Sequence, residues 1–319
     1  MPRRSRLARL LQSMCLAQGT LALAWLAWRW ARSPAEALAG AATLLCIGPA
    51  VLALELLIAA RKGNGGPVPA PTSLQLAQAW LRETGHMFRT FYWRQPFRWR
   101  AEPDHMDAAC AGRMGVVLVH GFMCNRGFWN GWLRELRTRG HACIAVNLEP
   151  PFASIDTYAE MIADAVARVT QLTGRPPTIV SHSMGGLAVR AWWRSAAQPA
   201  VARIVTIGTP HRGTWIARFS WRPNAKQMRL HSDWLKELAR DEQRKPLPPC
   251  TCWYSNCDNI VFPAASATLP GADNRFAPGT PHVALAFDPR VRAELVKFLT
   301  KSDPPRQGES FTGSTPEIV

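Results

Sequence analysis

The chain has 319 residues, of which 47% are hydrophobic and 19% charged, enough for one sizeable globular core and an accessory segment. This composition excludes a disordered, fibrous or small disulfide-stapled protein. The formal net charge of +16 suits either nucleic acid or an anionic membrane surface as a neighbour. The 14 Trp residues favour the membrane, and no nucleic-acid-binding motif is visible, so we expect no nucleic-acid partner.

The eight cysteines do not form a disulfide framework, because most of them stand singly. Only Cys250, Cys252 and Cys257 cluster, and no second group of Cys or His completes a tetrahedral metal set. We therefore expect free thiols in a reducing compartment, and neither a metal nor another cofactor.

Two apolar stretches near the N-terminus are long enough to cross a membrane. The first, from Leu10 to Trp28, has no charged residue over 19 positions. The second, from Ala37 to Ala60, has Glu55 as its only charge and is followed by Arg61. We predict that residues 1–62 form a transmembrane helical hairpin that anchors the chain in the membrane. The alternative is a cleaved signal peptide, which the length of the first stretch and the presence of the second disfavour.

The charges that flank these stretches predict the orientation of the hairpin. Four arginines precede the first stretch, and Arg61 and Lys62 follow the second, whereas the connecting turn carries two arginines and one glutamate. By the positive-inside rule, both ends of the hairpin face the cytoplasm. We therefore expect a multi-pass protein of the cell inner membrane whose following domain lies in the cytoplasm.

Residues 63–112 are expected to connect this anchor to the next domain. The Gly- and Pro-rich residues 63–71 are typical of a flexible linker. The stretch from Ser73 to Arg100 starts with a helical pattern and ends in interleaved arginines and aromatics. That composition suits a segment at the level of the lipid headgroups, and equally a helix packed against the next domain; the sequence leaves both open.

From Gly115 onward, short apolar runs alternate with amphipathic stretches, the pattern of a mostly parallel sheet flanked by helices. The predicted domain covers residues 113–300, and the polar residues 301–319 are expected to form a disordered tail. Strands are predicted at Val116–Val119, Cys143–Val146, Thr178–Ser181, Ile204–Ile207 and Thr251–Tyr254. Helices are predicted at Trp129–Arg139, at 155–172 with Ser154 as the cap, and at Gly185–Arg194, Asp233–Arg240 and Arg290–Leu299.

The strongest chemical signal is the segment Ser181-His182-Ser183-Met184-Gly185-Gly186, which lies between a predicted strand and a predicted helix. A tight turn at such a junction exposes the hydroxyl of its central serine, and small residues two positions away on either side let strand and helix approach. Ser183 is therefore the candidate nucleophile. Ser181 replaces the first glycine of the usual G-x-S-x-G pattern, a small change because its side chain is compact.

The apolar run Val116–Val119 continues into His120-Gly121-Phe122. Backbone N–H groups just past such a strand can face the nucleophile and, with the N–H after the serine, stabilise the oxyanion of a tetrahedral intermediate. The candidate donors are the backbone N–H groups of Phe122 and Met184. His120 is expected to be structural at this place rather than a base.

A serine nucleophile needs a base, and the base needs a carboxylate that orients it. His282 lies in a loop before the last predicted helix, where the chain order Ser, acid, His expects the base; His211 and His231 are its rivals. Asp258 follows the last predicted strand in a short loop and is the candidate acid, with Asp273 as the main alternative.

These motifs resemble those of the bacterial lipase and esterase branch of the α/β-hydrolase superfamily. Residues of about 113 to 300 carry them in the family's order: V-L-V-H-G-F, S-H-S-M-G-G, I-G-T-P-H-R-G-T, Y-S-N-C-D-N-I-V-F-P and a late P-H-V-A-L. The resemblance implies an α/β-hydrolase fold, a triad of Ser183, Asp258 and His282, and hydrolysis of acyl esters through an acyl-enzyme without a cofactor. Some larger relatives brace the acid and histidine loops with a disulfide and bind calcium nearby. No cysteine follows Cys257 here, so that brace is missing, and no calcium site is carried over.

The sequence thus predicts a membrane-anchored serine esterase or lipase whose substrate is an acyl ester or lipid in or at the bilayer. A triad does not distinguish oxygen esters from thioesters, so an acyl-thioesterase or a protein or lipid deacylase is an alternative. A non-catalytic membrane interaction protein on the same fold is the second alternative. The Trp- and Phe-containing residues 212–249 are expected either to form a lid or wall of an acyl site, or to pack as ordinary helices. Nothing in the sequence indicates an oligomeric state.

Overall fold

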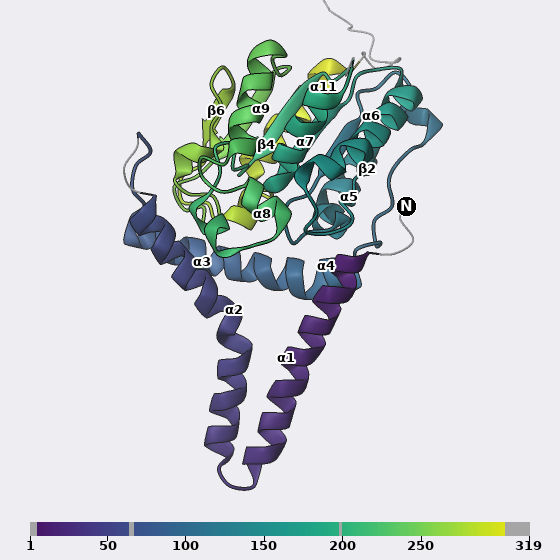
Figure 1. Cartoon of the computed structure of the whole chain (residues 1–319). Helices are drawn as coiled ribbons and strands as arrows, with labels where there is room; N and C mark the ends of the chain where they lie inside the picture. Colours follow the sequence, from purple (N-terminus) through teal and green to yellow (C-terminus); the bar gives the residue numbers. More distant parts are fainter. Residues whose placement is uncertain (1–4, 64–66, 198–199, 304–319) are drawn as a thin grey trace, which may run out of the picture.

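A computed structural model of the chain describes residues 5–63, 67–197 and 200–303. Figure 1 shows two long helices that project as a hairpin from a domain in which helices cover a sheet. A further helical stretch lies between the hairpin and the domain, along the base of the domain. The N-terminal third of the chain is therefore stacked under the domain that carries the chemical motifs.

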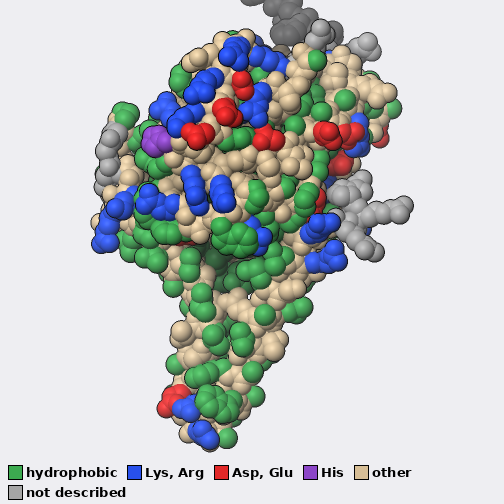
Figure 2. Space-filling view, in the orientation of Figure 1, with side chains coloured by type: hydrophobic (Ala, Val, Ile, Leu, Met, Phe, Trp, Pro, Cys, Tyr) green, Lys and Arg blue, Asp and Glu red, His purple; other side chains and the backbone are tan. Residues whose placement is uncertain are grey.

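The hairpin consists of α1 (Arg6–Trp30) and α2 (Pro34–Lys62). Both helices have the length and hydropathy of a membrane span, and only 11% of the most apolar window of each is buried within the protein. Figure 2 shows apolar side chains along the sides of the hairpin and charged side chains gathered at its tip. This arrangement is consistent with the predicted hairpin and suggests association with a membrane.

The stretch along the base of the domain runs from α3 (Ser73–Met87) through a π-helical segment, η1 (Phe88–Arg94), into α4 (Gln95–Phe97). We call residues 73–97 the juxtamembrane helix. Trp80 donates a hydrogen bond to the carbonyl of Pro49 in α2 (2.8 Å), and Gln12 of α1 donates one to the carbonyl of Pro96 (2.7 Å). The juxtamembrane helix therefore packs on both helices of the hairpin, while aromatic side chains remain exposed on it: Phe88, Trp93 and Phe97.

The sheet has six parallel strands in the order β2-β1-β3-β4-β5-β6. The prediction of a parallel sheet flanked by helices is confirmed, and all five predicted strands are present. The strands are β1 (Val116–Val119), β2 (Cys143–Ala145), β3 (Thr178–His182), β4 (Arg203–Ile207), β5 (Cys250–Tyr254) and β6 (Asp273–Phe276).

Helices cover both faces of the sheet because successive strand side chains point to opposite sides. Val117 and Val119 belong to one core with α6, α7 and α9, whereas Val116 and Leu118 belong to a second core with α5 and α11. The helices are α5 (Asn130–Thr138), α6 (Ala159–Thr173), α7 (Met184–Ser195), α8 (Pro223–Gln227), α9 (Asp233–Arg244), α10 (His282–Leu285) and α11 (Pro289–Ser302). Short 3₁₀ turns are η2 (Ala108–Cys110), η3 (Arg126–Trp129), η4 (Ile155–Tyr158), η5 (Trp215–Phe219) and η6 (Ala264–Ala267).

The structure differs from the sequence-based expectation at the C-terminal end of the chain. The sequence does not predict β6, because Asp273–Phe276 are polar and mostly exposed at the edge of the sheet. The predicted start of the tail at residue 301 is too early in the sequence. The helix α11 includes Lys301 and Ser302, and Asp303 pairs with Arg113 at 2.7 Å. Residues 304–319 of the expected tail and 64–66 of the expected linker lie outside the described residues.

Candidate active site

Ser183 stands where β3 ends and α7 begins. Its backbone has a φ of +56° and a ψ of −131°, a conformation that strains a residue with a side chain. The small neighbours allow strand and helix to approach: a Cβ on Gly185 would lie 2.5 Å from the carbonyl oxygen of Val119. Ser181 is buried, and its hydroxyl donates to the carbonyl of Val205 at 3.2 Å. The strained turn and the compact residues expected from the motif are therefore both present.

The two candidate oxyanion donors lie beside this turn. Met184 is the first residue of α7, and Phe122 lines the same cavity as Ser183. Gly121, just before Phe122, approaches the serine so closely that a Cβ there would lie 2.6 Å from the Cβ of Ser183. Within the described ranges, neither the Phe122 nor the Met184 N–H donates a hydrogen bond. These positions are compatible with the predicted role of the two N–H groups as oxyanion donors.

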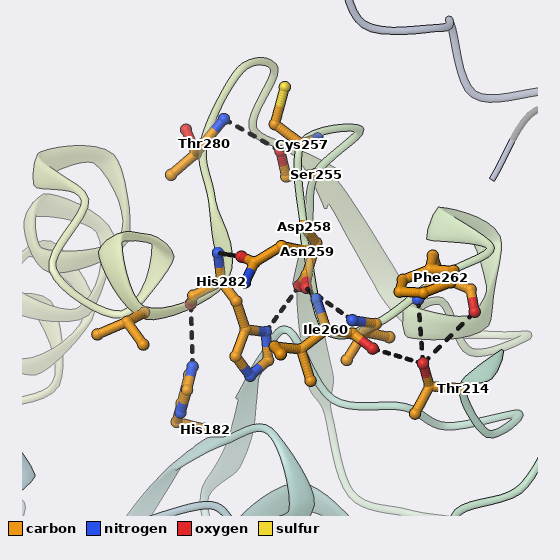
Figure 3. A network of polar contacts seen from close by, with 12 residues as sticks. His182, Thr214, Ser255, Cys257, Asp258, Asn259, Ile260, Phe262, Thr280 and His282 are labelled. Atoms are coloured by element: carbon orange, nitrogen blue, oxygen red, sulfur yellow. Dashed lines mark hydrogen bonds and ion pairs between the residues drawn. The ribbon is translucent and has the colours of Figure 1, made fainter. Parts of the chain in front are cut away.

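The structure brings the predicted acid and base into contact, as Figure 3 shows. The Nδ1 atom of His282 lies 2.9 Å from Oδ2 of Asp258, and both side chains are buried. Because an ionised carboxylate can only accept, Nδ1 carries the proton and Nε2 is left for proton transfer. Oδ1 of Asp258 accepts the N–H groups of Ile260 (2.9 Å) and Val261 (2.7 Å), which fixes the carboxylate.

The surroundings of His282 change its basicity. Burial alone would lower the pKa of the imidazole, but the negative charge of Asp258 and the hydrogen bond to it, together with the charge of Glu83, raise the pKa above its ordinary value. The acid partner therefore favours the protonated form of His282, the form that follows proton transfer from a serine.

The loop that carries His282 is held by several further hydrogen bonds (Figure 3). His182 donates through Nε2 to the carbonyl of His282 at 3.0 Å, and the side-chain oxygen of Asn259 accepts the N–H of His282 at 3.3 Å. The Ser255 hydroxyl accepts the N–H groups of Cys257 and Thr280, both at 3.1 Å. These bonds tie the acid loop to the histidine loop without a disulfide.

Two glutamates from the N-terminal segment also reach these loops, Glu83 the histidine loop and Glu55 the acid loop, and the sequence does not predict these contacts. Glu83 of α3 is 1% exposed and accepts the N–H groups of Val283 (2.7 Å) and Ala284 (3.1 Å). Glu55 of α2 accepts the side-chain N–H of Asn259 at 2.8 Å. A sequence signal exists for Glu55, because a single charge in an apolar helix needs a partner inside the protein.

A cavity of about 400 Å³ lies over Ser183 and His282. Most of its wall is apolar, and the wall comes from parts of the chain that are far apart in the sequence. These parts are α2 (Leu52), the juxtamembrane helix (Met87, Phe91), the β1 loop (Phe122, Met123) and residues 214–228 (Ile216, Ala217, Ala225, Met228). The first half of the 212–249 stretch therefore forms a wall of the cavity, while α9 packs against α7.

The rival candidates lie away from this cavity or have other partners. His211 is buried with its Nε2 3.0 Å from the Thr206 hydroxyl, and it lines a separate cavity of about 670 Å³ together with His231. Asp273 is exposed on β6 and pairs with Arg275. His120 accepts the N–H of Leu148 through Nε2 at 3.0 Å, a structural contact.

The burial of Glu83 gives stability a pH dependence. Burial raises the pKa of its carboxyl from 4.5 to about 7, and the hydrogen bonds from Val283 and Ala284 and the charge of His282 offset this only in part. Between these values the unfolded chain loses this proton while the folded protein keeps it, so stability falls as the pH rises. By neutral pH the free energy of unfolding of the wild type should have fallen by about 3 kcal/mol because of this group. Glu83→Gln cannot ionise and should not show this fall.

Thermal midpoints of the wild type and Glu83→Gln, measured in the same detergent across this pH window, test this expectation. The midpoint of the wild type should fall relative to that of the variant as the pH rises. A difference that does not change with pH would contradict it.

Comparison with known proteins places these features among hydrolases. Residues 116–312 match the family described as "Alpha/beta hydrolase family". The chain is 34% identical over 123 residues to triacylglycerol lipases of Pseudarthrobacter phenanthrenivorans and Burkholderia plantarii. Each alignment covers 35% of this chain and, respectively, 38% and 34% of the relative. The chain thus spans little more than a third of the length of these curated relatives.

Solved structures of similar fold include two lipases. The mature form of Bacillus licheniformis lipase BlEst2 aligns with a TM-score of 0.51 and 18% identity, over 61% of this chain and 94% of that one. Aspergillus fumigatus lipase B aligns with a TM-score of 0.55 and 20% identity, over 65% of this chain and 58% of that one. At these identities the likeness concerns the fold alone.

Proposed function

Because the chain belongs to the alpha/beta hydrolase family, we propose that it is a serine hydrolase that cleaves the acyl esters of membrane lipids. The observation that carries this proposal is the shared cavity: Ser183, on its strained turn, and His282, paired with Asp258, both line one apolar space. A nucleophile, an oriented base and a space for an acyl chain are the parts that ester cleavage requires.

The proposed reaction has two halves. The Ser183 hydroxyl gives its proton to Nε2 of His282 as its oxygen attacks the ester carbonyl carbon, and the N–H groups of Phe122 and Met184 hold the resulting oxyanion. The intermediate then expels the alcohol, which takes the proton from His282, and leaves an acyl group on the serine. Water attacks this acyl-enzyme with His282 again as base, and the carboxylic acid leaves. Asp258 keeps the imidazole oriented throughout.

The surroundings of the cavity support a lipid as the substrate. Leu52 comes from a helix with the hydropathy of a membrane span, and Met87 and Phe91 come from the juxtamembrane helix that packs on the hairpin. The proposed cavity for the acyl chain is therefore built partly by the segment that would lie in or at the bilayer. We also propose that the hairpin anchors the protein with its sheet domain on the cytoplasmic side, as the flanking positive charges favour.

A substitution in α2 should change the preference for acyl-chain length. In Leu52→Trp the larger side chain fills part of the cavity, so long chains lose space while short ones still fit. We expect the ratio of kcat/KM for lauroyl over butyryl p-nitrophenyl esters to fall about tenfold or more. Parallel assays of both esters in one detergent measure this ratio.

Leu54→Trp is the matched control, because Leu54 lies on the same helix but is 58% exposed and does not line the cavity. Its ratio should equal that of the wild type. Equal ratios of kcat/KM in the wild type and both variants would contradict a contribution of α2 to the acyl site. Matched thioesters in the same assay test the thioesterase alternative, which a higher kcat/KM for thioesters would favour.

A further inference from the structure

A third cavity, of about 520 Å³, lies between the juxtamembrane helix and the sheet domain and is lined by basic side chains. Arg89 and Arg94 come from η1, Arg134 from α5 and Arg292 from α11. These elements are far apart in the sequence, so only the folded chain brings the four guanidinium groups to one place. None of the four lines the cavity over Ser183.

The positive charge of this cavity is only partly balanced. Arg134 bonds Glu102, and Arg292 lies 3.3 Å from Glu135. Arg89 and Arg94 form no ion pair with a carboxylate in the described part of the chain, and the Arg94 guanidinium lies over the ring of Phe287, 5.8 Å from its centroid. Since Glu135 is the single acidic residue of the lining, positive charge is in excess.

Burial and mutual repulsion both lower the pKa values of these groups. Burial, and then the charges of Arg89, Arg134 and Arg292, lower the pKa of Arg94 to about 10. Burial and the neighbouring arginines lower the pKa of His86, also in the lining, to about 4. At neutral pH His86 is therefore uncharged and Arg94 still charged. Positive charges held this close together repel one another, and an anion bound among them relieves this repulsion.

We propose that this cavity binds the phosphate group of an anionic phospholipid. Guanidinium groups bind phosphate oxygens through paired, charge-assisted hydrogen bonds, and four of them converge here. The position of the cavity favours a phosphate that belongs to a lipid. The η1 segment that lines it also exposes Phe88 and Trp93, and it belongs to the helix that packs on the hairpin. Aromatics beside arginines are typical of the headgroup level. This inference rests on the membrane attachment proposed above, but not on catalysis.

Lipid retention by the full-length protein tests the proposal. The protein is equilibrated in mixed micelles with phosphatidylglycerol and phosphatidylcholine, and bound lipid is counted by native mass spectrometry. The wild type should retain phosphatidylglycerol selectively, and the double variant Arg89→Gln with Arg94→Gln should bind it about 30-fold more weakly, or about fivefold per lost charge. Arg292→Gln, on the opposite wall, should bind it about fivefold more weakly.

The matched control is Arg98→Gln with Arg100→Gln, which removes the same charge just beyond the juxtamembrane helix from two exposed arginines outside the cavity. It should retain lipid like the wild type. Equal loss in both double variants would overturn the proposal in favour of general charge attraction, and so would inorganic phosphate that binds as tightly as the lipid.

Turnover of a soluble butyryl ester in the same samples separates this proposal from the proposed function. The Arg89 and Arg94 variant should keep that turnover, which also shows that it is folded. Selective lipid retention by a wild type that hydrolyses no ester would support the lipid site and contradict the proposed hydrolase activity. Ester hydrolysis by a wild type that retains no lipid selectively would support the proposed hydrolase activity and contradict the lipid site.

Discussion

Replacing Ser183 with alanine is expected to lower the turnover of p-nitrophenyl acyl esters by about 10⁴- to 10⁶-fold. The oxygen that attacks the ester in the proposed reaction is lost, and the methyl side chain of alanine cannot act as a nucleophile. The remaining activity should come from the oxyanion donors and from binding alone. Steady-state kcat of the purified full-length protein measures the effect.

Ser181→Ala is the matched control, because Ser181 lies two residues away, is also buried, and bonds the carbonyl of Val205 instead of lining the cavity. Its kcat should stay within a few fold of the wild type, with a loss of stability of about 1 kcal/mol from the missing hydrogen bond. A Ser183→Ala protein that keeps wild-type turnover would exclude the proposed nucleophile.

Replacing Asp258 with asparagine is expected to lower kcat by about 10⁴-fold while leaving the fold intact. The amide of asparagine can donate to Nδ1 of His282, which then keeps its proton on Nε2 and cannot accept one from the serine. The loss should appear mainly in kcat, since Asp258 does not line the cavity over Ser183. Asp273→Asn, on the exposed edge strand, is the control and should change kcat little.

Asp258→Asn should also change the pH dependence of the activity that remains. The carboxylate of Asp258 raises the pKa of His282 against the effect of burial, so in the wild type activity is lost as the pH falls through this raised value. Without that charge burial dominates and the pKa of His282 falls, so the acid limb of kcat/KM should move to lower pH. An acid limb that moves to higher pH would contradict the assigned pair.

The parts of the site that the sequence predicts are those with a local pattern. The turn at Ser183 follows from a strand, a helix and small residues within one short segment, and the resemblance drawn from this and the other motifs is confirmed at the level of the family. The pairing of Asp258 with His282 follows from the order of strands and loops, because the ends of parallel strands meet at one edge of the sheet. The roles of these residues in catalysis stay predictions.

What the sequence does not predict depends on contacts between distant segments. Glu83 reaches Val283 across 200 residues, and Glu55 reaches Asn259 across 204, and neither contact has a periodicity that a local pattern could display. The division into an anchor, a connecting segment and a catalytic domain stays a prediction as well. In the structure, side chains of the first two parts complete the cavity and hold the histidine loop of the third.

The role of Ser183 as nucleophile can be tested by mapping a fluorophosphonate adduct by mass spectrometry on the detergent-solubilised, full-length protein. Fluorophosphonates react with a serine that a neighbouring base activates. We expect one adduct, on the peptide that contains Ser183, and a strong loss of labelling in Asp258→Asn. An adduct on another residue, or folded protein that does not label, would contradict it.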